Sequence, residues 1–355
     1  MPGSSLPEKD FSDRLLEWWQ TNGRHDLPWQ INRTPYRVWV SEIMLQQTQV
    51  TTVIGYFERF VARFPALPDL ARAPLDDVLA LWSGLGYYAR ARNLHKAAVH
   101  CLHAHDGQLP DGFEALRALP GIGDSTANAI IAQALDRRAP ILDGNVKRVM
   151  ARHAGIAGWP GRSAVARQLW AEADARTPND RAADYTQAIM DLGATVCTTR
   201  NPTCMLCPVQ ADCRARLDGR IAELPGKKPS RDRPERTSTW LIQRDGTGRL
   251  ALVRRPPTGI WGGLWCFPET NERGEQQSNA ECLPPIAHEF THFRLTMRFV
   301  ETGGEINDRQ VEDSDIAWLK PEEALRLGLP RPIRRAIESL ADRMPGNPHA
   351  NPEND

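Results

Sequence analysis

Four of the seven cysteines in this 355-residue chain fall within one short stretch, and their spacing restricts what that stretch can fold into. The four give the pattern C-x6-C-x2-C-x5-C near the end of the first two thirds of the chain. Thiols so close together are rare outside metal sites and disulfide frameworks. An odd number of cysteines in a long chain fits metal ligation better than a disulfide scaffold. The expected metal ligands are Cys197, Cys204, Cys207 and Cys213.

Zinc and iron–sulfur clusters both accept four cysteine thiolates, so chemistry alone separates the two only in part. Structural zinc sites often use two C-x2-C pairs, and this segment has one, between Cys204 and Cys207. We therefore expect one [4Fe–4S] cluster. Its expected role is to order the loop TRNPTCMLCPVQADC, in which Arg200 is a candidate contact for a phosphate group.

The first part of the chain has the apolar periodicity of successive helices. In RTPYRVWVSEIM, Thr34 is a candidate N-cap and Pro35 follows it at the first helical position. The helical period continues from there to Phe60, and short turns separate the later helical segments. No stretch of this first part shows sustained alternation of apolar and polar residues. The sequence therefore predicts an all-α domain over residues 1–225.

The composition changes at a proline-rich and charged stretch, which predicts a linker over residues 226–236. After it, TSTWLIQRD and GRLALVRRP are short alternating runs on either side of a DGTG turn, which predicts a hairpin. LKPEEALRLGLP and RPIRRAIESLADRM read as helices. We expect a smaller α+β domain over residues 237–343 and a disordered tail over residues 344–355.

Composition limits function only weakly. Apolar residues make up 41% and charged residues 25%, which is ordinary for a globular protein. The net charge is zero, so a polyanion would have to be held by local basic patches. No apolar run approaches the roughly 18 residues that span a bilayer, and the sequence begins without the apolar core of a signal peptide. We expect a cytoplasmic monomer that does not enter membranes.

One carboxylate stands out in the apolar stretch VWVSEIMLQQTQV. Val38, Glu42 and Leu45 recur at i, i+4 and i+7, so they share one face of a helix. Burying an unpaired carboxylate on such a face costs free energy. Glu42 is therefore a candidate functional acid.

Two glycine-containing motifs follow further along. LPGIGDSTANAI places Gly121 and Gly123 in a turn that opens a helix, where backbone N–H groups can hold a phosphate oxygen. The same spacing fits an ordinary glycine turn between helices equally well. PILDGNVKRVMAR places Asp143 and Asn145 in a turn beside Lys147. An aspartate just before a helix is most often an N-cap, so the residues alone leave the role of Asp143 open.

Taken together, LPGIGDSTA, ILDGNVKR and the cysteine pattern resemble the helix-hairpin-helix superfamily of DNA glycosylases that carry an iron–sulfur cluster. Within it, SEIMLQQTQV, GLGYYARARNL, WGGLWCFPE and FTHFRL resemble the adenine DNA glycosylase (MutY) family. The resemblance extends from about residue 10 to about residue 340. It implies a multidomain fold, with an all-α helix-hairpin-helix glycosylase domain followed by a Nudix-like domain that recognises 8-oxoguanine.

The resemblance implies a DNA-repair enzyme that removes adenine mispaired with 8-oxoguanine or guanine in double-stranded DNA. Such an enzyme flips the adenine out of the duplex before it cleaves the glycosidic bond. Glu42 corresponds to the acid that protonates adenine, and burial would raise its pKa toward neutrality. Asp143 corresponds to the carboxylate that stabilises the cationic sugar, and Asn145 to a residue that orients this chemistry.

The resemblance also assigns residues that contact DNA. Tyr87 corresponds to a wedge in the base stack, and Gln47 to a residue inserted near the orphan base. Trp29 and Gln187 fall where the family lines the adenine pocket, and Phe290–His292 fall in the loop that senses 8-oxoguanine. The expected substrate- and DNA-binding residues are Trp29, Gln47, Leu85, Tyr87, Gly121, Gly123, Ser125, Lys147, Gln187, Phe290, Thr291 and His292.

Other functions leave different traces in a sequence. The endonuclease-III branch of the superfamily carries a Schiff-base lysine where this chain has Ser125, which favours a glycosylase without an efficient lyase step. An endonuclease-III-like glycosylase/lyase acting on oxidised pyrimidines is the alternative. A DNA-binding module without catalysis would not need both Glu42 and Asp143.

The second domain is not expected to act as a Nudix hydrolase. After WGGLWCFPE the chain reads TNERGEQQSNAEC and lacks the glutamate-rich REUxEE box that holds magnesium, so we expect no nucleotide pyrophosphatase activity. The resemblance leaves room for contact with a replication clamp, but the sequence shows no motif for it.

Overall fold

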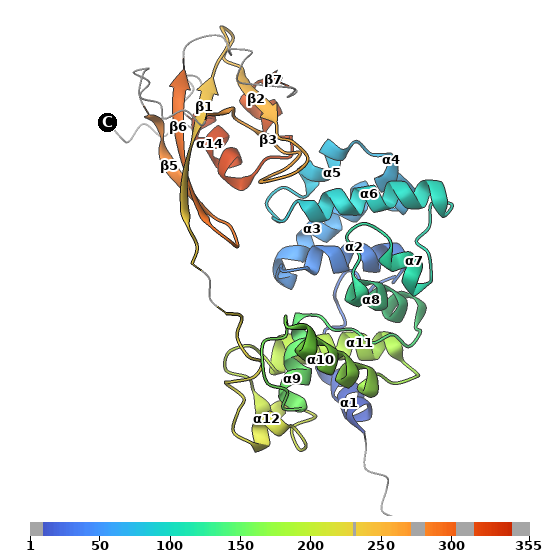
Figure 1. The fold of residues 1–355 in the computed structure, drawn as a ribbon. Helices are drawn as coiled ribbons and strands as arrows, with labels where there is room; N and C mark the ends of the chain where they lie inside the picture. Colours follow the sequence, from blue (N-terminus) through green and yellow to red (C-terminus); the bar gives the residue numbers. More distant parts are fainter. Residues whose placement is uncertain (1–9, 230–231, 271–280, 303–315, 343–355) are drawn as a thin grey trace, which may run out of the picture. The chain divides into compact units, whose positions relative to one another are not determined.

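The computed structural model describes residues 10–229, 232–270, 281–302 and 316–342 (Figure 1). The chain divides into two compact units. The first consists of Met1–Ala71 and Lys96–Pro229, and the second of Arg72–His95 and Ser230–Asp355. This division places Arg72–His95 with the C-terminal part of the chain, whereas the sequence-based boundary at residue 225 does not. The tail expected to be disordered lies outside the described residues.

Residues 10–229 contain helices and turns without strands, as the sequence predicts. Two helices, α4 (Leu67–Arg72) and α6 (Ala89–Ala104), contain the positions where the chain passes from one unit to the other. The helices are α1 (Phe11–Asn22), α2 (Pro35–Leu45), α3 (Val50–Arg63), α4 (Leu67–Arg72), α5 (Leu75–Leu81), α6 (Ala89–Ala104), α7 (Phe113–Arg117), α8 (Asp124–Leu135), α9 (Gly144–His153), α10 (Ser163–Arg176), α11 (Ala182–Asp191) and α12 (Arg214–Leu217), with a π-helical turn at Leu192–Val196 and a 3-10 turn at Cys204–Leu206.

The start of α2 follows the expected capping pattern. The Thr34 hydroxyl accepts a hydrogen bond from the backbone N–H of Arg37 at 3.2 Å, and Pro35 occupies the first turn. The helix ends earlier than the apolar period suggests. A short non-helical segment separates Leu45, the last residue of α2, from Val50, the first residue of α3. Gln47 lies in this break with a φ of 58°. The apolar pattern survives the break because α2 and α3 pack against each other.

The core of the first unit forms where α11 packs against α1, α8 and α9. At its centre the carboxylate of Asp191 has no solvent exposure. It accepts hydrogen bonds from the indole Nε1 of Trp19 at 3.0 Å and from the backbone N–H and guanidinium Nε of Arg24 at 2.8 Å each. It also accepts one from Nε2 of Gln187 at 2.8 Å. A buried charge is tolerated only when it is paired in this way.

The second unit contains two sheets and two C-terminal helices, which confirms the expected smaller domain of mixed composition. One sheet has the strand order β4-β1-β6-β5 and the other has the order β3-β2-β7. The elements are β1 (Glu235–Gln243), β2 (Leu250–Arg254), β3 (Trp265–Cys266), β4 (Glu269–Thr270), β5 (Glu281–Glu289), β6 (Arg294–Thr302), β7 (Ile316–Leu319), α13 (Pro321–Ala324) and α14 (Arg331–Asp342).

The prediction that the two strands flanking DGTG pair with each other as a hairpin was wrong, although the turn itself forms. The turn exists, because the Asp245 carboxylate accepts the backbone N–H groups of Thr247 and Arg249 at 2.9 Å each. Past one bridge between Arg244 and Leu250, however, β1 pairs with β6 in parallel and β2 pairs with β7 in the other sheet. Alternating runs identify half-buried strands but do not choose their partners.

Arg72–His95 forms part of the second unit through several specific contacts. The hydroxyls of Tyr88 and Ser83 both donate to the carbonyl of Leu329, at 2.9 and 3.2 Å. Gly328 lies so close to α5 that a Cβ there would meet the Cβ of Leu79 at 2.7 Å. Of the helices in the described ranges, none is long and apolar enough to cross a membrane.

Replacing Asp191 with alanine should destabilise the first unit by about 3 kcal/mol or more, because Arg24 and the Trp19 indole would lose a buried acceptor. Thermal unfolding measures this change. Arg117→Ala is the control, since Arg117 and Asp124 form an exposed ion pair worth at most about 1 kcal/mol. Equal losses in the two variants would show that the buried network does not stabilise the fold.

Candidate active site

Glu42 lies on α2, between residues that face the core of the first unit. Its side chain is partly buried, and its Oε1 accepts a hydrogen bond from Nε2 of Gln133 on α8 at 2.9 Å. Burial raises the pKa of Glu42 to about 7, the Gln133 bond opposes that rise, and the charge of Asp143 adds to it. Glu42 is therefore protonated over a large part of the neutral range.

Asp143 is the N-cap of α9. Its Oδ1 accepts a hydrogen bond from the backbone N–H of Val146 at 2.7 Å, and its Oδ2 accepts one from Nδ2 of Asn145 at 3.4 Å. Burial raises the pKa of Asp143, while the Val146 N–H group and the charges of Arg148 and Lys147 oppose the rise. The capping role is thus real. It also fixes one carboxylate oxygen, so that the group is held where it influences Glu42.

The glycine hairpin is tied directly to the Asp143 turn. Gly121 has a φ of 82°, which residues with a side chain rarely adopt, and Gly123 is the N-cap of α8. The Ser125 hydroxyl accepts a hydrogen bond from the backbone N–H of Leu142 at 3.1 Å. The start of α8 and the start of α9 therefore move together. A polar side chain at position 125 is used to hold the turn that carries Asp143.

Arg148 links the same turn to the first cysteine. Its guanidinium donates to Oδ1 of Asn145 at 2.8 Å, to the carbonyl of Gly193 at 2.7 Å and to the carbonyl of Cys197 at 2.7 Å. Gly193 packs tightly here, because a Cβ at this position would meet the Cβ of Asn145 at 2.6 Å. One side chain thus joins the Asp143 turn to the cysteine loop.

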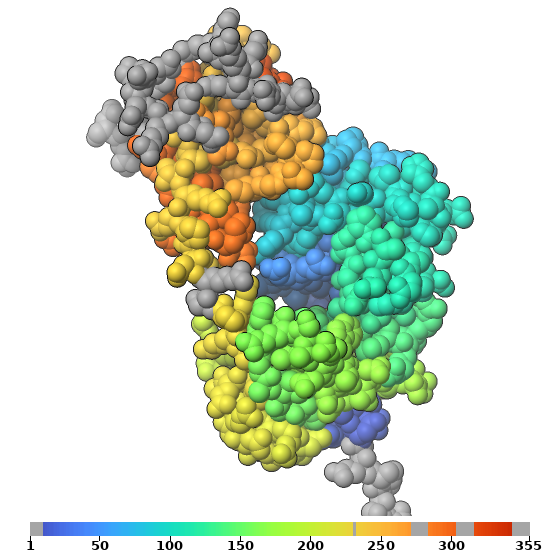
Figure 2. All heavy atoms as spheres, viewed as in Figure 1, coloured from blue at the N-terminus to red at the C-terminus, as the bar shows by residue number. Residues whose placement is uncertain are grey.

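The four expected metal ligands lie on the loop that ends at α12, beside α9 (yellow and green in Figures 1 and 2). All four thiols are free and partly buried. Burial raises the pKa of Cys207, and the charges of Cys197, Cys213 and Cys204 act on it in the same direction. Within the described ranges, no group of three or more His, Cys, Asp or Glu side chains is arranged to hold a metal ion.

The surroundings of the cysteine loop suit thiolate ligands. Arg152 is buried and donates to Sγ of Cys197 at 3.4 Å and to the carbonyl of Thr198 at 2.7 Å. Its Nε also donates to the carbonyl of Leu224 at 2.9 Å. The four cysteines supply the ligand type that iron–sulfur clusters use, although their described side chains are not arranged as a metal site.

Two residues expected to enter DNA share an unusual backbone. Gln47 in the first unit and Tyr87 in the second have φ values of 58° and 49°, in the left-handed region that non-glycine residues rarely adopt. Both side chains are exposed, and Tyr87 keeps 49% of its surface accessible to solvent. Strained backbone at exposed polar or aromatic residues is characteristic of functional positions.

Other predicted contact residues are less exposed. Trp29 is buried with its ring 5.5 Å from that of Phe57, and Leu85 is also buried. Gln187 is buried and donates to Asp191, and its Oε1 has no hydrogen-bond partner among the described residues. Lys147 is partly buried on α9. No contact described for Trp29 or Gln187 reaches Glu42, so their place in an adenine pocket stays a prediction.

The FTHF segment forms the turn between β5 and β6 of the second unit. The backbone N–H of Phe290 donates to the carbonyl of Phe293 at 2.9 Å, and their rings stack with centroids 4.5 Å apart. Thr291 and His292 lie exposed at the tip. This aromatic turn, residues 290–293, presents two polar side chains on a rigid base.

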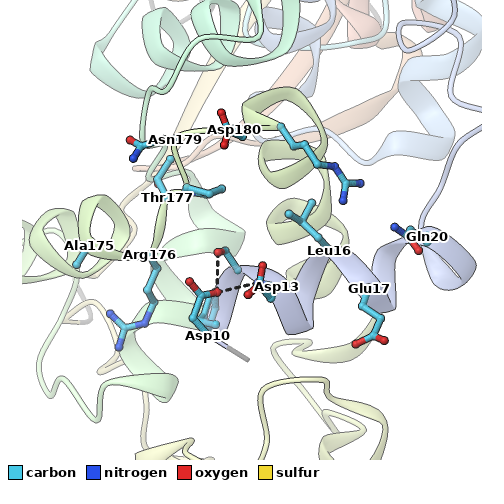
Figure 3. A pocket seen from close by; sticks show the side chains of 14 residues that line it. Asp10, Asp13, Leu16, Glu17, Gln20, Ala175, Arg176, Thr177, Asn179 and Asp180 are labelled. Carbon is cyan, nitrogen blue, oxygen red and sulfur yellow. Dashed lines mark hydrogen bonds between the residues drawn. The ribbon is translucent and has the colours of Figure 1, made fainter. Parts of the chain in front are cut away.

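A hollow of about 710 Å³ in the first unit lies away from these residues (Figure 3). The start of α1 and the segment from the end of α10 to Arg181 line it. Asp10 already accepts hydrogen bonds there from the Ser12 hydroxyl and the Asp13 N–H, both at 2.8 Å. None of the predicted site residues borders this hollow.

Two family models and a number of known proteins match the sequence of this chain. A family model described as "HhH-GPD superfamily base excision DNA repair protein" matches residues 40–174, and one described as "NUDIX domain" matches residues 239–339. The adenine DNA glycosylase of Buchnera aphidicola subsp. Acyrthosiphon pisum is 37% identical over 341 residues, covering 93% of this chain and 97% of that protein. The chain belongs to the adenine DNA glycosylase family. It is a DNA glycosylase of base-excision repair.

Relatives outside bacteria and solved structures extend the comparison. The Homo sapiens adenine DNA glycosylase is 35% identical over 358 residues, covering 81% of this chain and 65% of that protein. The structure of a thermostable thymine-DNA glycosylase matches with a TM-score of 0.54 and 27% identity over 59% of this chain and 95% of that one. An endonuclease III–DNA complex matches with a TM-score of 0.50 at 21% identity, which shows a shared fold.

Three residues of this glycosylase were not predicted from the sequence. Gln133 binds Glu42, Arg148 joins Asn145 to Cys197, and Asp191 binds Gln187. Gln133 did leave a trace, because it interrupts the apolar run AIIAQAL on the buried face of α8. Arg148 and Asp191 leave none, since the partners that reveal their roles are far away in the sequence: Cys197 for Arg148, and Trp19 and Arg24 for Asp191.

The rate of adenine excision should fall as the pH rises through about 7, by up to tenfold per pH unit, because Glu42 can donate a proton only while it is protonated. Gln133→Leu removes a bond that favours the ionised carboxylate, so the fall should begin at higher pH. Single-turnover rates between pH 5 and 9 test both statements.

Asn128→Leu is the control for Gln133→Leu. Asn128 lies on the same helix but donates to the carbonyl of Pro140, so the position of the pH transition should not move. A transition at the same pH in wild type and Gln133→Leu would show that Glu42 does not set it.

Proposed function

We propose that this glycosylase excises adenine paired with 8-oxoguanine or guanine in double-stranded DNA, and that it does so by acid-assisted hydrolysis without strand cleavage. The observation that carries the proposal is a pair of partly buried carboxyls, Glu42 with a pKa of about 7 and Asp143, whose charge acts on it. Glycosidic cleavage needs one protonated acid and one carboxylate near the sugar. The names of the relatives support adenine as the base.

The first step supplies a proton to the departing base. Once adenine is turned out of the stack, the Glu42 carboxyl donates its proton to N7, and the glycosidic electrons leave with a neutral base. Gln133 holds the carboxyl through Oε1, and we assign the proton transfer to the other oxygen, Oε2. Regeneration of Glu42 requires the proton from the attacking water.

The second step concerns the sugar. Departure of adenine leaves positive charge on the anomeric carbon, and the Asp143 carboxylate is held by Val146 and Asn145 to stabilise that charge. Arg148 fixes Asn145 in turn. A preorganised carboxylate stabilises the transition state more than a mobile one, because no reorganisation is needed as charge develops.

The exposed residues act on the duplex. Tyr87 is proposed to wedge into the base stack and Gln47 to occupy the space beside the orphan base. Both residues are exposed and have a strained backbone, which supports a functional role. Phe290, Thr291 and His292 are proposed to contact the base opposite adenine, where Thr291 and His292 offer polar groups to the edge altered in 8-oxoguanine.

A lyase step is not proposed. Ser125 occupies the position of the lysine in the lyase branch, and its hydroxyl is already used by the Leu142 N–H group. Lys147 lies on α9 beside Asp143 but is not assigned a catalytic role. The alternative function is excision of oxidised pyrimidines with strand cleavage. Its only support is the fold that this chain shares with endonuclease III.

The cysteine loop is proposed to hold one [4Fe–4S] cluster through Cys197, Cys204, Cys207 and Cys213. When bound, the cluster would hold this loop in shape, and Arg148 would carry that order to the Asp143 turn. Cys204→Ser should lose the visible absorption of iron–sulfur and bind DNA more weakly. Cys101→Ala is the control, since Cys101 is a buried free thiol outside the loop. Colourless wild-type protein with stoichiometric zinc would contradict the cluster.

Glu42→Gln tests the mechanism. It should lower single-turnover excision of adenine opposite 8-oxoguanine at least about 100-fold, the usual size of a general-acid contribution, and leave DNA binding intact. The substrate set is adenine opposite 8-oxoguanine, guanine and thymine, plus thymine glycol opposite adenine, each with and without alkali. Strand breaks should appear mainly after alkali.

Two results would overturn the proposal. Excision by Glu42→Gln at the wild-type rate would remove the acid from the mechanism. Cleavage at thymine glycol without alkali, with adenine left in place, would move the protein to the lyase branch.

A further inference from the structure

The segment that presents Tyr87 is built as a turn with three left-handed residues. Gly84, Gly86 and Tyr87 have φ values of 96°, 79° and 49°. The indole Nε1 of Trp82 donates to the carbonyl of Gly86 at 3.1 Å and closes the turn from one side. Because such a conformation is unfavourable for Tyr87, its neighbours must hold it.

Tyr88 holds this turn and also joins it to the C-terminal part of the second unit. Its buried hydroxyl accepts a hydrogen bond from the N–H of Gly84 at 3.2 Å and donates to the carbonyl of Leu329 at 2.9 Å. Ser83 donates to the same carbonyl and receives a hydrogen bond from Nε of Arg334 at 3.3 Å. The wedge turn therefore rests on the segment that leads into α14.

That segment is connected to the aromatic turn at residues 290–293. Leu329 lies two positions before Arg331, the first residue of α14, and α14 packs on β5. Burial lowers the pKa of His288 on β5, and the charge of Arg331 at the start of α14 lowers it further. The His288 ring lies 4.7 Å from that of Phe290.

A second connection reaches α6 by a different path. The Trp261 ring lies 5.4 Å from Phe290 and 5.5 Å from His288. Trp261 has a φ of 54°, and the carbonyl of the next residue, Gly262, accepts a hydrogen bond from the Arg92 guanidinium. A side chain at Gly262 would meet the Pro257 carbonyl at 2.4 Å, so this turn has little room to move.

We propose that Tyr88 and Arg92 are positioning residues through which the aromatic turn at 290–293 sets the wedge turn that carries Tyr87. When the aromatic turn settles on the base opposite adenine, the displacement reaches Leu329 and Gly262, and from there Tyr88 and Arg92. The identity of the opposite base thereby controls how readily adenine is extruded. This inference rests on the proposed function, since it assumes that residues 290–293 and Tyr87 both contact the duplex.

Tyr88→Phe tests it, with Tyr36→Phe as the matched control. Both tyrosines are 8% exposed and donate to a backbone carbonyl, but Tyr36 binds Phe64 within the first unit. The measured quantity is the ratio of single-turnover excision rates for adenine opposite 8-oxoguanine and opposite guanine. Tyr88→Phe should lower this ratio about fivefold, the change expected for one lost hydrogen bond, whereas Tyr36→Phe should leave it within about twofold.

Arg92→Met tests the second path and keeps most of the side-chain volume. It should lower the same ratio. Combining Tyr88→Phe with Phe290→Ala distinguishes a shared path from two independent effects, because only a shared path makes the losses less than additive. The pH dependence should be unchanged in every variant, since Glu42 is not altered.

The outcomes separate this inference from the proposed function. Wild-type protein that does not release adenine would refute both. Wild type that prefers 8-oxoguanine, with Tyr88→Phe and Tyr36→Phe giving equal ratios, would refute only the positioning role. Equal slowing of both substrates by Tyr88→Phe would show that the hydroxyl merely stabilises the turn, and would also overturn the inference.

Discussion

A carboxyl group buried beside a second carboxyl is the constraint on which the first unit depends. Glu42 lies on α2, its hydrogen-bond donor Gln133 on α8, and Asp143 at the N-cap of α9. The pKa values of both acids are therefore raised only once these three helices have packed together. The helix contacts, the Ser125 bond to Leu142 and the Arg148 bonds all serve this convergence. The fold holds together two groups that would separate in water.

Much of the site could be predicted because its residues lie in contiguous motifs. Glu42 was visible as an acid in an apolar stripe, and the cysteines as a spacing. The resemblance then supplied roles that no pattern contains, such as those of Tyr87 and Phe290. Long-range partners could not be predicted, because Gln133 or Arg148 reaches its partner only after the helices pack. Strand pairing failed for the same reason, since alternation in β1 and β2 is compatible with either sheet.

Strained backbone recurs where the molecule meets DNA in the proposed mechanism. Gln47 and Tyr87, which are proposed to contact DNA, have positive φ without being glycines, and so does Trp261, whose ring lies 5.4 Å from that of Phe290. Such conformations persist only where surrounding contacts determine them, and each costs of order 1 kcal/mol or more. For Tyr87 those contacts include the Tyr88 hydroxyl and the Trp82 indole. In the proposed mechanism, the residues that contact the duplex therefore depend on neighbouring contacts that hold a strained backbone.

The division of the chain into units has a consequence for its synthesis. Arg72–His95 leaves the ribosome long before the residues from Ser230 onward, with which it forms a compact unit. Until Gly328 and Leu329 arrive, Leu79 and the Tyr88 hydroxyl lack the surface against which they pack. The second unit can therefore be completed only at the end of translation. Proteolytic cleavage in the linker at 226–236 would therefore not separate the two units, because the second unit contains residues from both sides of the cut.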